Sequence, residues 1–343
     1  SRDEHTSLTA AKWLHRELPV RLAHRIYDLD RLPYGLSAMP SVRVVRDWYL
    51  RSLLDIRRFP TPSTAAEELQ FTELLRGIYE RHAHTLITMA KGVVEFKKKL
   101  QEDAGGEKVD LTDYQGVHHF LDGFYMSRVG IRVLIGQHLA LHEEQRDDWV
   151  GLVCLNTSPA AVAKAAIEDA RYMCDRQFGV CPDVTLHGCL NETFPFMPSH
   201  LHHILFEIIK NSLRAVVEFH GQDADDYPAV RVIVADSKDN EDVVIKVSDE
   251  GGGIARSSMH RIWSYFYTTA YAQFDLVDAT DFSVDTPLAG LGYGLPLSRV
   301  FARYFGGDIN IMSMEGYGTD AFLHLRKVGN AQEPLVHAMH KSL

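Results

Sequence analysis

The sequence has few cysteines, and their spacing is not that of a metal centre. None of the four belongs to a C-x-x-C pair, and no paired histidines accompany them. We therefore expect buried free thiols, which suit a reducing compartment. The four residues are Cys154, Cys174, Cys181 and Cys189.

An excess of positive charge and long apolar runs are also missing. Lysine and arginine number 36 against 46 acidic residues, and the net charge of −10 argues against nucleic acid as the main partner. No apolar run approaches the roughly 20 residues that a membrane-spanning helix needs, so we expect no membrane insertion. The 343 residues are 45% hydrophobic and 24% charged, which is enough for two domains with proper cores.

The amino-terminal part has the periodicity of helices. Breaks rich in proline or glycine separate four periodic segments, which predicts a four-helix bundle. Thr64 and Glu67 fit a capping box at the start of the third segment. A charged stretch at 142–150 predicts the domain boundary. The four segments cover residues 9–29, 42–58, 65–100 and 114–144.

A predicted helix around residues 203–214 separates polar from apolar side chains. At about 100° per residue, its polar side chains fall within an arc of roughly 100°. The carboxylate of Glu207 and the amide oxygen of Asn211 lie one turn apart, so one can orient a hydroxyl group while the other binds Mg²⁺. The opposite face is apolar. The polar residues are His203, Glu207, Lys210, Asn211 and Arg214, and the apolar ones are Leu201, Ile204, Leu205 and Ile208.

Two interpretations of this polar face stay open. His203 precedes Glu207 by one turn and is placed to hydrogen-bond the carboxylate and tune its proton affinity. Alternatively, the helix is an ordinary amphipathic one, in which Lys210 pairs with Glu207 and Arg214 pairs with Glu218.

Two glycine clusters follow this helix. Residues 243–249 read as a strand that ends in Asp249-Glu-Gly251-Gly252-Gly253, where glycine permits close approach of a ligand and the acid can accept an exocyclic amine proton. Gly290-Leu291-Gly292-Tyr293-Gly294-Leu295 opens a helix, whose first N–H groups can cradle phosphate. A G-x-G-x-G pattern is weak alone. Between the clusters, the polar residues 271–285 predict either an ATP lid or a plain solvated loop. Gly316-Tyr-Gly318-Thr319 then precedes a final strand at 321–325.

The order of these elements over residues 155–327 resembles the ATP-binding fold of gyrase-type ATPases, heat-shock chaperones, sensor histidine kinases and mismatch-repair ATPases, the GHKL superfamily. Within this range, five short sequence motifs resemble more closely those of the mitochondrial protein kinases that phosphorylate pyruvate dehydrogenase and branched-chain ketoacid dehydrogenase. They begin at Pro198, Glu207, Ser248, Gly292 and Ser313. The implied fold is α+β, with an α/β sandwich after the bundle. The expected domains are 1–148 (regulatory and lipoyl-binding), 149–330 (ATP-binding) and 331–343 (a short tail).

The amino-terminal half carries further motifs of the same family. They are Glu17-Leu-Pro-Val-Arg, Leu32-Pro-Tyr-Gly-Leu, Arg46-Asp-Trp-Tyr and Phe124-Tyr-Met-Ser-Arg128-Val-Gly-Ile-Arg132. The residues around Pro287 and Tyr304 favour the pyruvate dehydrogenase kinases over the branched-chain ketoacid dehydrogenase kinase, which is the alternative assignment. The tail after Gln332 is similar to plant or protist members and lacks the Asp-Trp pair that animal members use in dimer contacts and lipoyl-domain binding. The start at Ser1 leads us to expect a removed targeting peptide and a longer natural chain.

The resemblance implies a protein-serine kinase that uses Mg-ATP to phosphorylate and inactivate the alpha subunit of pyruvate dehydrogenase. It implies a homodimer in the mitochondrial matrix, the lipoyl domain of dihydrolipoamide acetyltransferase as a partner, and ADP and pyruvate as effectors. It also admits K⁺ beside ATP and Mg²⁺. Glu207, His203 and Lys210 would be catalytic and Asn211 would hold the metal. ATP-binding positions would be Asn211, Arg214, Asp249, Gly251, Gly253, Thr268, Thr269, Gly290, Leu291, Gly292, Tyr293, Gly294, Leu295 and Thr319.

The same resemblance places a regulatory carboxylate site in the bundle. Tyr49, Ser52, His82, Arg128 and Arg132 match positions that line the pocket for pyruvate or dichloroacetate. The two arginines lie one helical turn apart and can form a fork for a small carboxylate. Alternatively, they form interhelical salt bridges with acids such as Asp122. Tyr79 stands where animal members have arginine, so the sensitivity to pyruvate is expected to differ.

Other classes fit less well. A sensor histidine kinase needs H-[ED]-x-x-x-P around a phosphoacceptor histidine, but Asp147 occupies the proline position after His142-Glu143; His118 and His119 are further candidates. A chaperone or repair ATPase should continue into a large transducer domain. A nucleotide-binding scaffold would not need Glu207 and Asn211 intact. The V-A-I-K, H-R-D and D-F-G motifs of two-lobed kinases and the G-x-x-x-x-G-K-[ST] loop are absent from the sequence.

Overall fold

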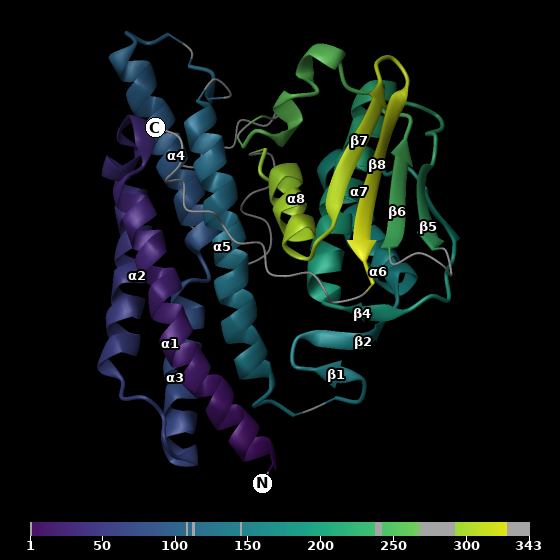
Figure 1. Cartoon of the computed structure of the whole chain (residues 1–343). Coiled ribbons are helices and arrows are strands. Elements are labelled where there is room, and N and C mark those ends of the chain that lie inside the picture. Colours follow the sequence, from purple (N-terminus) through teal and green to yellow (C-terminus); the bar gives the residue numbers. More distant parts are fainter. Residues whose placement is uncertain are drawn as a thin grey trace. The chain divides into compact units, whose positions relative to one another are not determined.

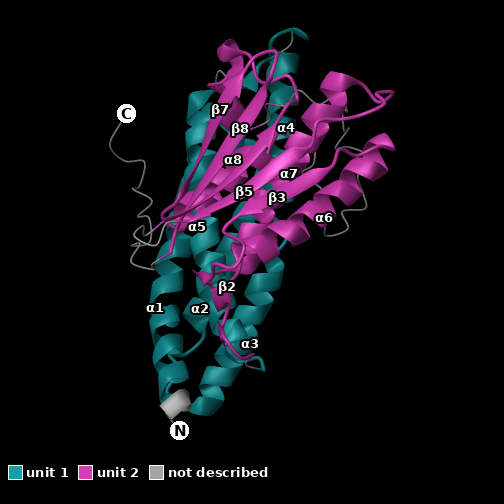
Figure 2. Cartoon of the chain, turned by 90° about the vertical axis from the view of Figure 1, so that its right-hand side faces the viewer, with its two compact units in different colours: residues 1–145, 270–290 teal, residues 146–269, 291–343 magenta. Residues whose placement is uncertain are grey.

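A computed structural model describes residues 2–107, 109–111, 114–144, 146–236, 242–265, 267 and 292–327 of this chain. The chain divides into two compact units, the first made of residues 1–145 and 270–290 and the second of residues 146–269 and 291–343 (Figure 2). Each unit has a hydrophobic core of its own. The tail at 331–343 and the predicted lid at 271–285 lie outside the described residues.

The first unit is helical. Its helices are α1 (Arg2–Asp30), the 3-10 helix η1 (Pro33–Ala38), α2 (Pro40–Arg58), α3 (Ala65–Arg81), α4 (Thr85–Asp103) and α5 (Gln115–Ala140) (Figure 1). The three predicted breaks are confirmed, and α1 is continuous through Pro19. The capping box is also confirmed, because the Thr64 hydroxyl accepts from the Glu67 N–H and the Glu67 carboxylate accepts from the Thr64 N–H. Two satisfied N–H groups thus fix the start of α3.

The single helix predicted over residues 65–100 is wrong, because α3 ends at Arg81 and α4 begins at Thr85. Helix ends leave carbonyl groups without intrahelical partners. Here α5 supplies the donors: Arg132 donates to the Tyr79 carbonyl over 3.2 Å, and Arg128 donates to the His82 carbonyl over 3.1 Å. The break is therefore stabilised by arginines far along the chain, and no proline or glycine marks it.

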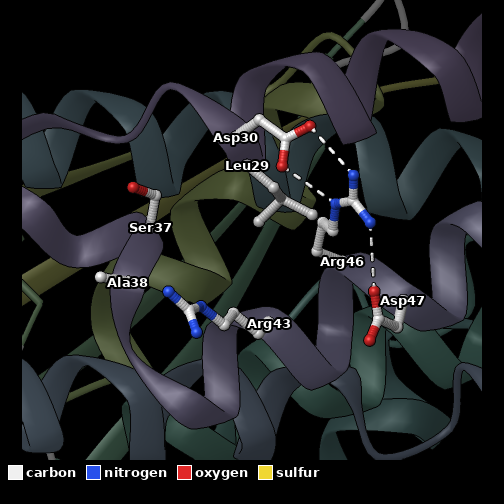
Figure 3. Close-up of a pocket in the computed structure, with 7 residues that line it drawn as sticks. All are labelled: Leu29, Asp30, Ser37, Ala38, Arg43, Arg46 and Asp47. Atoms are coloured by element: carbon white, nitrogen blue, oxygen red, sulfur yellow. Dashed lines mark hydrogen bonds and ion pairs between the residues drawn. The ribbon is translucent and has the colours of Figure 1, made fainter.

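Arg46 and Asp47, which begin one of the amino-terminal motifs, line a hollow of about 370 Å³ in the first unit (Figure 3). Arg46 lies on α2 and holds Asp30 at the end of α1, with Nε–Oδ1 at 2.9 Å, and it also contacts Asp47 at 3.2 Å. The guanidinium therefore ties the last turn of α1 to α2. The hollow is lined by Leu29, Asp30, Ser37, Ala38, Arg43, Arg46 and Asp47.

The second unit is built on a five-stranded sheet with the order β3-β5-β6-β8-β7. Only the β3–β5 pair is parallel. The helices α6 (Pro159–Phe178), α7 (Pro198–His220) and α8 (Gly294–Tyr304) share one core with the sheet, which makes a two-layer α/β sandwich. The strands are β3 (Val184–Gly188), β5 (Val230–Asp236), β6 (Asp242–Asp249), β7 (Asp308–Met314) and β8 (Gly318–Arg326).

A small antiparallel sheet precedes this sandwich. It consists of β1 (Trp149–Val150), β2 (Val153–Thr157) and β4 (Phe194–Phe196), in the order β1-β2-β4. The predicted α+β class is confirmed, as are the strand at 243–249 and the helix after the second glycine cluster. The last strand starts earlier than predicted, because Gly318 and Thr319 already pair with Met314 and Ser313.

The four cysteines are free thiols, as predicted, but only Cys174 is buried. The expectation that all four are buried is therefore wrong. Along the described part of the chain, the search for a helix able to cross a bilayer found none.

Candidate active site

One face of α7 is apolar and buried, and this packing sets the position of the polar face opposite to it. Leu201, Ile204, Leu205 and Ile208 are buried in the core, as the helical periodicity predicted. This packing fixes the rotation of α7, because an amphipathic helix turns its apolar face to the core. The opposite face, with Glu207, Asn211 and Arg214, is thereby set away from the sheet.

The charged groups of this face form pairs within the helix. Lys210 Nζ donates to Glu207 Oε1 over 2.6 Å, and Arg214 Nε donates to Glu218 Oε1 over 2.6 Å. These are the pairs that the alternative interpretation anticipated. Asn211 is exposed on the same face. The side chain of Glu207 is only 13% exposed, so its carboxylate is fixed rather than freely solvated.

Glu207 also meets the second glycine cluster. A Cβ atom placed on Gly294 would lie 2.0 Å from Glu207 Oε2, so only glycine leaves room for the carboxylate. Gly294 is the first residue of α8, where N–H groups have no partner within the helix. The structure thus brings Glu207 of α7 against Gly294 at the start of α8, although 87 positions separate the two residues in sequence.

His203 precedes Glu207 by one turn of α7, and one of its ring nitrogens is buried without a partner among the described residues. Its Nε2 atom is buried and has no hydrogen-bond partner in the described part of the chain. That atom therefore does not make the suggested bond to Glu207. Burial lowers the pKa of His203, while the negative charge of Glu207 opposes this shift. A buried nitrogen without a partner is costly, and such atoms concentrate where a ligand or water completes the site.

Asp249 lies at the end of β6 and is 6% exposed. Its Oδ2 accepts from the Ser212 hydroxyl over 2.8 Å, and its Oδ1 accepts from the N–H groups of Gly251 and Thr319 over 3.0 and 3.3 Å. Burial raises the pKa of Asp249 despite these three bonds. Asp249 and Thr319 are register partners of β6 and β8, so the predicted pair is brought together.

The first glycine cluster does more than leave room for a ligand. A Cβ atom on Gly251 would lie 2.6 Å from the Cβ of Ala215, so glycine at this position lets the loop pack against α7. Gly253 has a φ of +67°, and its added Cβ would lie 2.1 Å from the Met314 carbonyl oxygen. The expectation that these glycines face a ligand is thus incomplete, because both are also needed for packing against the protein itself.

The second cluster is described from Gly292 onward. Tyr293 is fully buried against the ring of Tyr265, whereas Gly292 and Leu295 are partly exposed. The tyrosine side chain therefore belongs to the core, and only its backbone is available to a ligand. The predicted site residues Thr268, Thr269, Gly290 and Leu291 lie outside the described residues.

Two serines of this site were not predicted. Ser212 lies on the buried side of α7 and donates to Asp249, and Ser313 accepts from the Ile254 N–H over 2.7 Å while contacting the Thr319 hydroxyl over 2.9 Å. A serine at an apolar position of an amphipathic helix was the available signal for Ser212. Its polar atom needs a buried partner, and the nearest acid in the motif series is Asp249.

The described residues fit Mg-ATP. Its adenine amine would find an acceptor in Asp249, and its phosphates would find the backbone N–H groups at the start of α8. Asn211 offers an oxygen to a hard cation. The buried His203 Nε2 without a hydrogen-bond partner in the described part of the chain lies one turn from Glu207, where a ligand or water would complete its bonding.

A second polar cluster lies in the first unit. Tyr49, Ser52, His82 and Arg128, which the resemblance places in the regulatory site, are all buried. Ser52 Oγ contacts His82 Nε2 over 3.0 Å and accepts from Arg81 over 2.8 Å. Arg81 was not predicted.

The arginines of this cluster bond to backbone carbonyls, as described for the α3–α4 break. Arg132 also stacks 3.8 Å over the ring of Tyr79. Arg128 Nε is buried and has no hydrogen-bond partner in the described part of the chain. Burial and the nearby arginines lower the pKa of His82 to about 3, and burial lowers the pKa of Arg128 to about 10. A small anion bound here would find a donor already in place.

Comparison with known proteins decides the family. A model of the mitochondrial branched-chain alpha-ketoacid dehydrogenase kinase matches residues 1–154, and a model of the histidine kinase-, DNA gyrase B- and HSP90-like ATPase matches residues 197–329. The mitochondrial pyruvate dehydrogenase (acetyl-transferring) kinase of Arabidopsis thaliana is 47% identical, with 97% of this chain and 88% of the relative aligned. The chain belongs to the pyruvate dehydrogenase kinase family.

Other members are more distant but equally complete. The corresponding kinase of Schizosaccharomyces pombe is 35% identical over 96% of this chain and 91% of its own length, and kinase isozyme 4 of Mus musculus is 36% identical over 97% and 80%. The family model that matches residues 1–154 bears the name of the branched-chain kinase, whereas these relatives are named pyruvate dehydrogenase kinases. Because the relatives align over nearly the whole chain, this pyruvate dehydrogenase kinase family member is a protein kinase with a gyrase-type ATPase unit.

Proposed function

We propose that this kinase transfers the γ-phosphoryl group of ATP to a serine of the alpha subunit of pyruvate dehydrogenase and thereby inactivates that enzyme. The observation that carries the proposal is the convergence of Glu207, Asp249 and the start of α8 in one unit of a chain from this family. The relatives' names supply the substrate, and the geometry supplies an acid, an adenine acceptor and a phosphate cradle.

Each residue then has a role in the transfer. Asp249 accepts from the adenine amine, with Ser212 and Thr319 fixing its two oxygens. Free N–H groups at the start of α8 and the guanidinium of Arg214 bind the phosphates. Asn211 would hold Mg²⁺, which when bound would supply positive charge beside the phosphates. Positioning and charge stabilisation supply most of the rate enhancement in phosphoryl transfer.

Glu207 orients the serine hydroxyl and accepts its proton as the new O–P bond forms and the bond from the γ-phosphorus to the ADP oxygen breaks. Lys210 donates to Glu207 Oε1 and holds that carboxylate against Gly294. His203 lies one helical turn before Glu207 with its Nε2 buried, and the charge of Glu207 opposes the lowering of the His203 pKa by burial. General-base catalysis contributes about 10²–10⁴-fold in rate.

The variant Glu207→Gln tests this assignment. It removes the base while keeping the shape, so ATP should bind with near wild-type affinity in calorimetry while phosphoryl transfer falls at least about 100-fold. Glu218→Gln removes another carboxylate of α7 and serves as the control, with transfer expected to continue. Near-normal turnover of Glu207→Gln would exclude Glu207 as the base.

The regulatory cluster is proposed to bind pyruvate through Arg128 and Arg132. The buried Arg128 Nε that lacks a partner in the described part of the chain supports this proposal. Arg128→Met should abolish inhibition by pyruvate, with circular dichroism checking that α3 and α4 remain helical. Unchanged inhibition in a folded variant would place the effector elsewhere.

The remaining family properties are proposals for this chain. They are the domains 1–148, 149–330 and 331–343, binding of the lipoyl domain of dihydrolipoamide acetyltransferase, ADP as an effector, homodimer formation, K⁺ as a further ion and residence in the mitochondrial matrix.

A histidine-kinase activity is the second candidate, and His142 decides against it. Its Nδ1 contacts the His138 carbonyl oxygen over 2.8 Å and its Nε2 contacts Glu68 over 2.8 Å. Both ring nitrogens therefore lie against oxygen atoms, and the Glu68 carboxylate occupies the side from which a phosphoryl group would have to approach Nε2. Acid-labile phosphate on the protein after incubation with ATP would restore this candidate.

A further inference from the structure

Three ligand-type side chains meet in the first unit, apart from both clusters described above. Glu68 on α3, His138 on α5 and His142 in the turn after α5 place one donor atom each within 4.8 Å of the others. Glu68 Oε1 lies 2.8 Å from His142 Nε2 and 3.4 Å from His138 Nε2. The side chains of Glu68, His138 and His142 are 6%, 3% and 15% exposed. They form a buried cluster at the end of the bundle where α5 ends.

A neutral His142 ring would leave its contact with Glu68 without a hydrogen. His142 Nδ1 faces the His138 carbonyl oxygen over 2.8 Å, and a carbonyl can only accept, so the one hydrogen of a neutral ring belongs on Nδ1. Nε2 then presents a lone pair to the carboxylate oxygen, which also presents a lone pair. This conflict holds for either tautomer of His138. A cation between the two atoms resolves it.

The neighbouring atoms favour a metal ion over a proton. A proton would serve the His142–Glu68 contact alone, whereas an ion at this point would also bind His138 Nε2. The Thr72 hydroxyl lies 2.8 Å from His138 Nε2 and 3.2 Å from Glu68 Oε1, and so closes a fourth side. Four separations between these atoms, of 2.8, 2.8, 3.2 and 3.4 Å, reach the spacing of about 3.3 Å between donors held tetrahedrally at about 2.0–2.1 Å from Zn²⁺.

The surroundings also match those of known metal ligands. The His138 carbonyl accepts from the ring N–H of His142, which is the kind of outer contact that orients a metal-binding imidazole. Two imidazoles and one carboxylate suit Zn²⁺ and its neighbours among the transition metals, whereas Mg²⁺ prefers oxygen donors alone.

We propose that Glu68, His138 and His142 bind one Zn²⁺ ion, with Thr72 or water as the fourth ligand. The ion would cross-link α3 to the carboxyl-terminal end of α5. Because a folded site binds the metal and an unfolded chain does not, occupancy stabilises the first unit. This site is separate from the proposed Mg²⁺ position at Asn211, which lies in the other unit.

The test is direct Zn²⁺ binding by the full chain, with any affinity tag removed and after dialysis against a chelator. Zn²⁺ is titrated calorimetrically in excess Mg²⁺, and Co²⁺ replaces it to give a visible absorption band. We expect one tight site per chain and a rise in melting temperature with Zn²⁺. His142→Gln should weaken binding at least about tenfold and abolish both the band and the thermal shift. His119→Gln, which alters an exposed histidine of α5, is the matched control and should behave as the wild type.

Glu68→Gln provides a second variant if His142→Gln does not fold. It keeps the size of the side chain and should also weaken Zn²⁺ binding while circular dichroism stays unchanged. Absence of saturable Zn²⁺ binding by the wild type would overturn the proposal. Equal affinity of the folded His142→Gln and His119→Gln variants would overturn it as well, and the cluster would then be a proton-sharing pair.

Discussion

Asp249 is predicted to trade stability for nucleotide binding, and Asp249→Asn separates the two. The carboxylate is 6% exposed, and burial raises its pKa above the ordinary value of 3.8. The folded protein therefore holds the proton more tightly than the unfolded chain. This favours folding fully below about pH 3.8, and the advantage is lost as the pH rises through the raised pKa of the folded state. At pH 7 the charge is a net cost to folding.

The amide can keep all three hydrogen bonds of the carboxylate. Its oxygen can accept from the Gly251 and Thr319 N–H groups, while its NH₂ group can donate to the Ser212 hydroxyl. We therefore expect the melting temperature of Asp249→Asn at pH 7 to equal or exceed that of the wild type. A buried charge that is removed without leaving an unpaired group has often proved neutral or stabilising.

Nucleotide binding should respond in the opposite direction. An amide in this orientation offers no free charged acceptor to the adenine amine. Hydrogen bonds to charged groups are worth about 1.5–3 kcal/mol, so the Kd for ATP should rise about 10- to 150-fold. Asp320→Asn is the control, because Asp320 lies next to Thr319 but pairs with Lys246 at the surface, and its ATP affinity should be unchanged.

Calorimetric titration with ATP and thermal melting of the same samples provide both readouts. A variant that binds ATP like the wild type would refute the adenine contact. A variant with a much lower melting temperature would refute the argument that the charge is a cost to folding.

Three further predictions concern other parts of the chain. Hydrogen bonding from Cys174 and the charge of Arg171 lower the pKa of Cys181 to about 7, so Cys181 should be alkylated faster at pH 7 than the buried Cys174, and mass spectrometry showing equal rates would contradict this. Thr64→Ala removes a helix cap worth about 1 kcal/mol, so amide exchange in the first turn of α3 should accelerate roughly fivefold, with the exchange of α5 unchanged as the control. Burial opposes ionisation of Asp308, but its arginine partners lower its pKa to about 2. Its contribution to stability is therefore present above about pH 3.8 and lost as the pH falls toward 2, and Asp308→Asn should flatten this part of the stability curve.

The sequence predicted the helices and strands of the fold better than the breaks between them. Strand β6 and helix α8 follow from alternation and from a glycine-marked helix start, which are local signals. The break between α3 and α4 depends on Arg128 and Arg132, which lie more than 40 residues away in sequence. The pattern of neighbouring residues does not reveal a hydrogen-bond donor so far along the chain, and it therefore predicts one helix across the break.

The site shows the same division. Glu207 and Asp249 were found because each belongs to a motif with a recognisable neighbourhood. Ser212 was missed because its partner lies on another element, 37 positions along the chain. Gly251 was predicted to leave space for a ligand and Gly294 to belong to a phosphate cradle, but the atoms that lie against them, from Ala215 and Glu207, are known only once the elements are packed.

The most direct test of the central claim is transfer of radiolabelled γ-phosphate from ATP to purified pyruvate dehydrogenase, with branched-chain ketoacid dehydrogenase in parallel. The account predicts acid-stable label on serine of the pyruvate dehydrogenase alpha subunit, loss of dehydrogenase activity, and no label with Glu207→Gln. Label on neither dehydrogenase from a chain that still binds ATP would contradict it.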